Sequence, residues 1–255
     1  MDRETTVKRI LQSFLPENPL TRKRGNPRDG LKTLRTGTTI VGFKFKNGVL
    51  LAADRRTMWG SKIVSHDTVK VESVSRVTGI GCAGLVSDGQ YIKNLLGQVN
   101  RSFRLRAGVP LTIRGQANYV ASLLHEAYSY GFPFELEMII CGFNFFGSFE
   151  IFEILEDGCL ADKDFTVVGS GTWDALHVLE ERKRSIANSS LVLEDAVSLA
   201  VDAIYNSGEH DSGTSPVTAT LPSVAIVTSG GFDYVEEKVI QSARRQVLKR
   251  RKKNG

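Results

Sequence analysis

The pattern of apolar and polar positions changes at residue 38, where a leader containing basic residues, proline and glycine gives way to strand-like runs. Apart from Lys44, residues 39–45 and 49–53 are apolar or β-branched, and the pair Asn47-Gly48 between them is typical of a tight hairpin turn. Two antiparallel strands are therefore predicted at the start of the folded body. Further short strands are predicted at 62–64, 69–71 and 77–84.

Helical periodicity follows these strands. Ser87 and Gln90 are spaced as in a capping box, which predicts a helix that runs to about Arg106. Later elements are predicted as a helix at 115–130, a meander of strands at 136–168, helices at 172–184 and 193–207, a buried strand at 224–227 and a last helix at 234–251. This order predicts an α+β fold with two sheets packed face to face between two helical layers.

Charge divides the chain into three parts: a leader at 1–37, a body at 38–243 and a basic tail at 244–255. The leader carries nine basic and four acidic residues, and the body carries 17 basic and 24 acidic residues. Residues 244–253 contain seven basic residues and no acidic one. Basic ends can bind nucleic acid or acidic partners. A solvated tail is the simpler interpretation, and no nucleic-acid-binding motif is present, so nucleic acid is not expected as a partner.

Several classes of protein are excluded by the sequence. No apolar run approaches the length of a membrane span, and the apolar stretch of the leader is too short for a secretory signal. The three cysteines (Cys82, Cys141 and Cys159) have no metal-type spacing, and neither do the four histidines. We therefore expect reduced thiols, a cytoplasmic location and no bound metal.

The candidate chemistry centres on Gly37-Thr38, at the junction of leader and body. If the chain is cut there, Thr38 becomes an N-terminal residue that carries both a hydroxyl nucleophile and a primary amine. A free α-amine titrates near ~8, which suits a general base. The plainer alternative is that Thr38 and Thr39 are ordinary β-branched residues opening a strand.

An N-terminal threonine needs a cation, an oxyanion donor and groups that orient its amine. Candidates for these roles lie at strand ends and turns, and each of them also has an ordinary structural explanation. They are Asp54, Lys70, Gly84, Ser170, Asp211 and Thr214. Lys70, for example, lies in the predicted strand Val69-Lys70-Val71 and could simply face solvent there. None of these residues identifies a site by itself.

Together, these residues resemble proteasome β subunits of the bacterial (actinobacterial) or archaeal kind, over about residues 36–237. Thr36-Gly37-Thr38-Thr39 is similar to the family's autocleavage site, and Asp54 and Lys70 follow Thr38 at successive spacings of 16 residues. The other matching motifs are Asp54-Arg55-Arg56, Ala83-Gly84-Leu85, Val168-Gly169-Ser170-Gly171 and Asp211-Ser212-Gly213-Thr214.

The resemblance implies the αββα sandwich of N-terminal-nucleophile (Ntn) hydrolases and a threonine-type endopeptidase activity without metal or organic cofactor. It assigns Thr38 as nucleophile and, through its amine, as base. Lys70 would lower the pKa of the nucleophile, Asp54 would pair with Lys70, and the Gly84 N–H would bind the oxyanion. Ser170, Asp211 and Thr214 would orient the amine. The leader would be a propeptide, and the precursor would be inactive.

The resemblance also implies a specificity pocket and partners. The pocket residues would be Thr57, Thr68, Glu72, Cys82, Val86 and Gln90, which favours cleavage after hydrophobic residues. The partners would be proteasome α subunits, other β subunits in stacked seven-membered rings, a regulatory ATPase ring and unfolded protein substrates. Two departures from the family pattern are Thr57-Met58-Trp59 at the substrate-binding edge and Ser215-Pro216 in place of glycines.

Two alternatives remain open beside a catalytic proteasome subunit. One is the related double-ring bacterial protease with an N-terminal threonine, whose chains carry almost no leader. The other is a non-catalytic ring subunit, which usually lacks either the Gly-Thr junction or the lysine.

Overall fold

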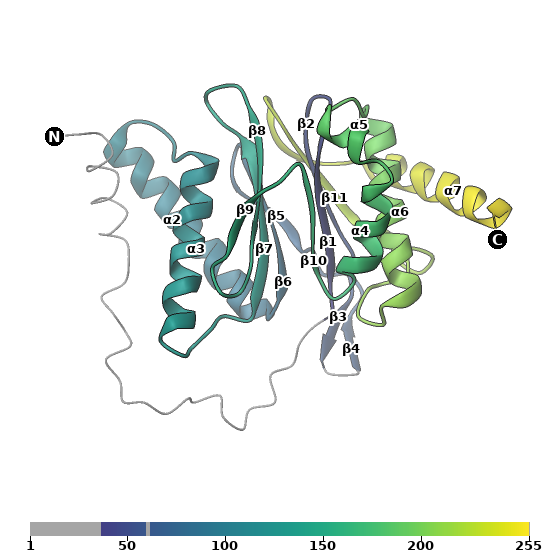
Figure 1. Cartoon of the computed structure of the whole chain (residues 1–255), viewed down its shortest axis with the longest axis horizontal. Helices are drawn as coiled ribbons and strands as arrows, with labels where there is room; N and C mark the ends of the chain where they lie inside the picture. The colour runs from purple at the N-terminus through teal and green to yellow at the C-terminus, as the bar shows by residue number, and fades with distance from the viewer. Residues whose placement is uncertain (1–36, 60–61, 255) are drawn as a thin grey trace.

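Two five-stranded antiparallel sheets face each other in the computed structural model, which describes residues 37–59 and 62–254 (Figure 1). The first sheet has the order β10-β1-β2-β11-β12 and the second β5-β6-β7-β8-β9. The strands of the first sheet are β1 (Thr39–Phe45), β2 (Gly48–Ala53), β10 (Phe165–Gly169), β11 (Ser223–Thr228) and β12 (Gly231–Tyr234). Those of the second are β5 (Val71–Ser75), β6 (Thr78–Gly84), β7 (Leu136–Phe143), β8 (Phe149–Ile154) and β9 (Leu160–Asp162).

Helices cover the outer face of each sheet, which completes four layers (Figure 1). The second sheet is covered by α2 (Val86–Ala107) and α3 (Ile113–Ser129). The first is covered by α4 (Thr172–Glu180), α5 (Lys183–Ala187), α6 (Leu193–His210) and α7 (Glu237–Asn254). The predicted α+β class and four-layer αββα sandwich are confirmed. None of the described helices is long and apolar enough to cross a membrane.

The core consists of three apolar clusters, one between each pair of adjacent layers. Successive strand residues point to opposite faces. Val41 and Leu50 accordingly pack under the helices on the first sheet, whereas Ile40 and Leu51 pack between the two sheets. Both faces of the first sheet are covered, which explains why β2 reads as a continuous apolar run rather than an alternating one.

Several local predictions are corrected by the structure. The hairpin of β3 (Thr57–Trp59) and β4 (Lys62–Ser65) contains a strand that was not predicted, and the helix predicted over 172–184 is divided into α4 and α5. The helix predicted to be capped by Ser87 instead has Leu85 at its N-cap, so Ser87 lies inside its first turn and the capping box is wrong. Tyr234 ends β12 and precedes α7.

The C-terminal helix runs unbroken through the boundary that charge suggested at residue 244. Ile240, Ala243 and Val247 bury one of its sides in the core. Near its end, Arg250 and Arg251 pair with Asp202 of α6, which is 8% exposed. The predictions made for residues 1–36 lie outside the described part of the chain.

Replacing Leu51 by alanine is expected to lower the free energy of unfolding by about 2–5 kcal/mol, because the side chain is buried between the sheets and its loss leaves a cavity. Chemical denaturation followed by circular dichroism measures this change. The matched control is Leu105→Ala: Leu105 is 86% exposed, so a change within about 0.5 kcal/mol is expected. Equal losses in the two variants would contradict the burial of Leu51.

Candidate functional site: the Gly37–Thr38 junction

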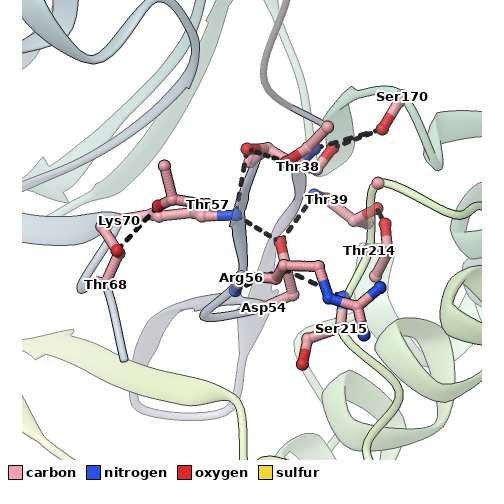
Figure 2. Close-up of polar contacts among 12 residues, drawn as sticks. Thr38, Thr39, Asp54, Arg56, Thr57, Thr68, Lys70, Ser170, Thr214 and Ser215 are labelled. Atoms are coloured by element: carbon pink, nitrogen blue, oxygen red, sulfur yellow. Dashed lines mark hydrogen bonds and ion pairs between the residues drawn. The ribbon is translucent and has the colours of Figure 1, made fainter. Parts of the chain in front are cut away.

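Thr38 immediately precedes β1 and has its hydroxyl between a cation and a carbonyl group (Figure 2). The Lys70 ammonium donates a hydrogen bond to Thr38 Oγ1 over 3.0 Å, and this hydroxyl donates to the Gly37 carbonyl over 2.8 Å. Thr38 is only 3% exposed, although it adjoins a pocket. The hydroxyl oxygen therefore lies beside the peptide bond that the sequence marked for cleavage.

Lys70 is held by Asp54, which follows β2 at the edge of the two-sheet core. The Lys70 Nζ–Asp54 Oδ1 distance is 2.8 Å, and both side chains are almost fully buried. Asp54 also accepts hydrogen bonds from the backbone N–H groups of Thr39, Arg56 and Ser215. These donors stabilise the buried carboxylate in its charged form. Lys70 itself precedes β5, so its predicted place inside a strand is wrong.

The pKa of Lys70 is lowered from its ordinary value, mainly because burial disfavours the ammonium, while the Asp54 carboxylate opposes this shift. A buried ammonium beside a hydroxyl stabilises that oxygen as it loses its proton, and low local dielectric strengthens the effect. Asp54, Lys70 and Thr38 thus form a chain of polar contacts that ends on the hydroxyl.

The backbone nitrogen of Thr38 belongs to a second polar network, separate from the contacts of its hydroxyl. The Thr38 N–H donates to Ser170 Oγ over 3.1 Å, and Ser170 Oγ donates to Asp211 Oδ2 over 2.5 Å. Thr214 Oγ1 also donates to Asp211 Oδ2, so Thr39 Oγ1 is the donor in the 2.5 Å contact with Thr214. Ser170, Asp211 and Thr214 therefore meet around the nitrogen that cleavage would release.

Two glycines permit these close approaches. Gly169 has φ +101°, and a Cβ there would lie 2.1 Å from the carbonyl oxygen of Thr38, to which Ser170 N–H donates. Gly84, the last residue of β6, has φ +118°, and a Cβ there would lie 2.1 Å from the Glu135 carbonyl oxygen. Only glycine tolerates both the left-handed conformation and this contact.

A pocket of about 180 Å³ opens beside Thr38 and Gly84, and we refer to it by the name used in the prediction, the specificity pocket. All six residues predicted for it line it: Thr57, Thr68, Glu72, Cys82, Val86 and Gln90. Lys93 also lines the pocket and forms an ion pair with Glu72. Burial raises the pKa of the Cys82 thiol to about 12, so the thiol remains neutral at physiological pH.

Three contributors to the site were missed from the sequence. Lys93 lies three residues after Gln90 on α2, and this helical spacing was a usable signal. Ser215 contributes its backbone N–H, which no side-chain motif reveals. Gly213 packs directly on Gly37, since a Cβ on Gly213 would lie 2.4 Å from the Cα of Gly37. This contact holds the junction against the loop after α6.

The arrangement can carry out nucleophilic chemistry on an acyl group. It combines a hydroxyl, a buried cation on that hydroxyl, a hydrogen-bonded nitrogen on the same residue and an adjoining pocket. Within residues 37–59 and 62–254, no three His, Cys, Asp or Glu side chains are grouped so that they could hold a metal ion.

Comparison with known proteins agrees with this geometry. The family model described as "Proteasome subunit" matches residues 34–220. The chain is 34% identical over 206 residues to "Proteasome subunit beta 2" of Sulfurisphaera tokodaii, covering 81% of this chain and 94% of that protein. It is 30% identical over 211 residues to "Proteasome subunit beta" of Methanopyrus kandleri, covering 83% and 97%.

A further relative, "Proteasome subunit beta 2" of Sulfolobus acidocaldarius, is 32% identical over 200 residues, covering 78% of this chain and 93% of the relative. These matches extend over nearly the whole of each relative, so they concern the entire folded body and not an isolated motif. The chain therefore belongs to the proteasome β-subunit family, and its four-layer sandwich is that family's Ntn-hydrolase fold.

Proposed function

We propose that this chain is a catalytic β subunit of a 20S-type proteasome core and acts as a threonine-type endopeptidase after cleavage between Gly37 and Thr38. The observation that carries the proposal is the position of the Thr38 hydroxyl. It lies 3.0 Å from the ammonium of Lys70 and 2.8 Å from the carbonyl oxygen of the peptide bond to be cut.

In leader removal, Thr38 Oγ attacks the carbonyl carbon of Gly37 as its proton leaves. The bond between Gly37 and the Thr38 nitrogen breaks, and this nitrogen takes up the proton. The product is an ester between Gly37 and the Thr38 hydroxyl, together with a free Thr38 amine. Water then hydrolyses the ester and releases residues 1–37 with a carboxylate on Gly37.

In the mature enzyme, the Thr38 amine accepts the hydroxyl proton, and Lys70 stabilises the developing negative charge on Oγ. Thr38 Oγ attacks the substrate carbonyl, with the Gly84 N–H assigned to the resulting oxyanion. The leaving amine takes the proton from the Thr38 ammonium, and water hydrolyses the ester that remains on Thr38. Ser170, Asp211 and Thr214 orient the amine throughout, which their hydrogen bonds support.

The specificity pocket supports cleavage after apolar side chains. Val86 is exposed in it, the Cys82 thiol is neutral, and the charges of Glu72 and Lys93 offset each other. The hydroxyls of Thr57 and Thr68 are hydrogen-bonded to each other, which makes them less available to a polar substrate group.

We further propose the assembly that the family implies: seven-membered β rings stacked on rings of α subunits, in the cytoplasm, with an ATPase ring that supplies unfolded protein. The non-catalytic alternative is disfavoured because Thr38, Lys70, Asp54, Ser170 and Asp211 form one connected network. The relatives of this chain support a proteasome subunit over the double-ring protease.

The test is intact-mass measurement with N-terminal sequencing after co-expression of the full chain with its host's α subunit. We expect the β chain in assembled particles to begin at Thr38 and to have lost the mass of residues 1–37. Assembled particles that retain the leader on every β chain would overturn the catalytic proposal and favour the structural subunit.

A further inference from the structure

A second pocket, of about 450 Å³, adjoins the reaction centre and carries an unusual concentration of negative charge. We call it the acidic pocket, after the four carboxylates that line it: Glu135, Glu137, Glu156 and Asp211. Among the described residues, no basic side chain lines this pocket. A pocket of this volume accommodates one or two side chains of a peptide.

The acidic pocket and the specificity pocket meet at Gly84 beside the reaction centre. Gly84 lines both pockets, while Thr38 lines the specificity pocket and Gly37 and Ser170 line the acidic one. A substrate carbonyl must lie next to Thr38 Oγ and Gly84, so the two halves of the substrate diverge from this point. If the acyl half enters the specificity pocket, the leaving half enters the acidic pocket.

Two of the four carboxylates are engaged by the protein. Glu137 accepts a hydrogen bond from the Gly169 N–H, and Asp211 accepts from Ser170, Thr214 and the Gly213 N–H. Their charge still contributes to the field in the pocket, but their positions are fixed by these contacts. Within residues 37–59 and 62–254, the carboxylates left to meet a ligand are therefore those of Glu135 and Glu156.

Glu135 is the clearest indication that a ligand completes the pocket. Its Oε2 atom is buried and accepts no hydrogen bond from the described residues, and a buried carboxylate oxygen without a donor is unfavourable. The backbone carbonyl of Glu135 packs against Gly84 and accepts from the Leu85 N–H, so this residue is anchored beside the reaction centre. Glu156 approaches from the turn between β8 and β9, with its side chain exposed.

Two cations close to Asp54 have their hydrogen-bond partners outside the pocket carboxylates. Lys70 is bound to Asp54 and Thr38, and Arg56 donates to the carbonyl oxygen of Ser212. Neither lines the acidic pocket. Within the described part of the chain, no cation is therefore paired with the carboxylates of the acidic pocket, and their charge can attract a cation of a bound peptide.

We infer that the acidic pocket binds a lysine or arginine side chain on the leaving side of the scissile bond, so that the enzyme prefers substrates with a basic residue just after the cleaved bond. This inference rests on the proposed peptidase function and adds a substrate class to it. Glu135 and Glu156 determine the preference. Partly exposed charge pairs are individually weak, so a preference of roughly 5- to 10-fold is expected from two of them.

The test uses assembled, leader-free particles and three internally quenched peptides. The peptides are identical except that the two residues after the cleaved bond are both lysine, both glutamine or both glutamate. We expect kcat/KM to fall in the order lysine, glutamine, glutamate. In Glu135→Gln/Glu156→Gln, the lysine-to-glutamine ratio should fall to about one, and added salt should reduce the ratio in the wild type.

A matched control is Glu194→Gln/Glu236→Gln, which removes two exposed carboxylates that do not line the acidic pocket. This control should keep the wild-type ratio. A second control is a short fluorogenic peptide whose leaving group is a neutral dye amine. Its kcat/KM should be similar in wild type and in both double variants, since its leaving side offers no cation to the pocket.

The possible outcomes distinguish a failure of this inference from a failure of the proposed peptidase function. Equal kcat/KM for the lysine and glutamate peptides, with normal hydrolysis of the fluorogenic peptide, overturns the inference and leaves the peptidase intact. An undiminished lysine preference in Glu135→Gln/Glu156→Gln also overturns it. If the wild type hydrolyses neither kind of peptide, the proposed function fails and the inference fails with it.

Discussion

Substitution of Thr38 by alanine is expected to abolish both leader removal and peptide hydrolysis. The variant lacks the hydroxyl that Lys70 contacts over 3.0 Å, and no other described residue offers a hydroxyl in that position. Loss of a catalytic nucleophile typically lowers kcat by at least about 10⁴-fold. Intact mass reports the leader, and a fluorogenic peptide with an apolar residue before the dye reports hydrolysis.

Two further variants separate the effect of the hydroxyl from that of the leader. Thr38→Ser retains a hydroxyl and should still lose its leader, with measurable hydrolysis. A Thr38→Ala chain supplied without residues 1–37 has a free amine but no hydroxyl, and it should remain inactive. Hydrolysis by this chain at more than a small fraction of the wild-type rate would place the nucleophile elsewhere.

Substitution of Lys70 by methionine is expected to have the second largest effect, because it removes the only cation that contacts Thr38 Oγ1 within the described structure. Methionine preserves much of the apolar stem but cannot stabilise an alkoxide. Loss of one electrostatic group of this kind lowers kcat by roughly 10²–10³-fold. Leader removal should slow with hydrolysis, since both reactions use the same hydroxyl.

The same substitution should also lower stability. Breaking a buried ion pair from one side costs about 3–5 kcal/mol, because the remaining charge is left without its partner. Asp54 keeps three backbone donors, so we expect the lower end of this range. Thermal unfolding measures the change, and hydrolysis must be compared at a temperature where both proteins are folded.

Lys44→Met is the matched control, since Lys44 pairs with Asp164 over the same distance of 2.8 Å but on the surface. Its loss should change stability by less than about 1 kcal/mol and leave kcat unchanged. Wild-type hydrolysis by Lys70→Met would contradict the role given to Lys70, whatever happened to stability.

The main side chains that the structure brings together around Thr38 could be predicted from the sequence because they follow local signals. Strands end in turns, and the side chains at those ends are free of the ladder, so Asp54 and Ser170 could be singled out by position. Asp211 was singled out because it lies in a polar loop, which the structure places directly after α6. The spacing from Thr38 to Asp54 and from Asp54 to Lys70 then matched a known pattern. Even so, Lys70 was misplaced in a strand, because an apolar neighbour on each side is not specific for β structure.

The sequence by itself determined most of the helices and strands and the four-layer arrangement, because alternation and helical periodicity are encoded within short stretches. Only the tertiary structure decided which backbone groups complete the site. Asp54 and the Ser215 N–H are separated by 161 positions, and a backbone donor has no side chain to signal it. The acidic pocket also depends on the tertiary structure. Its carboxylates come from β7 and the residue before it, the β8–β9 turn and the loop after α6, which meet only when the sheets pack.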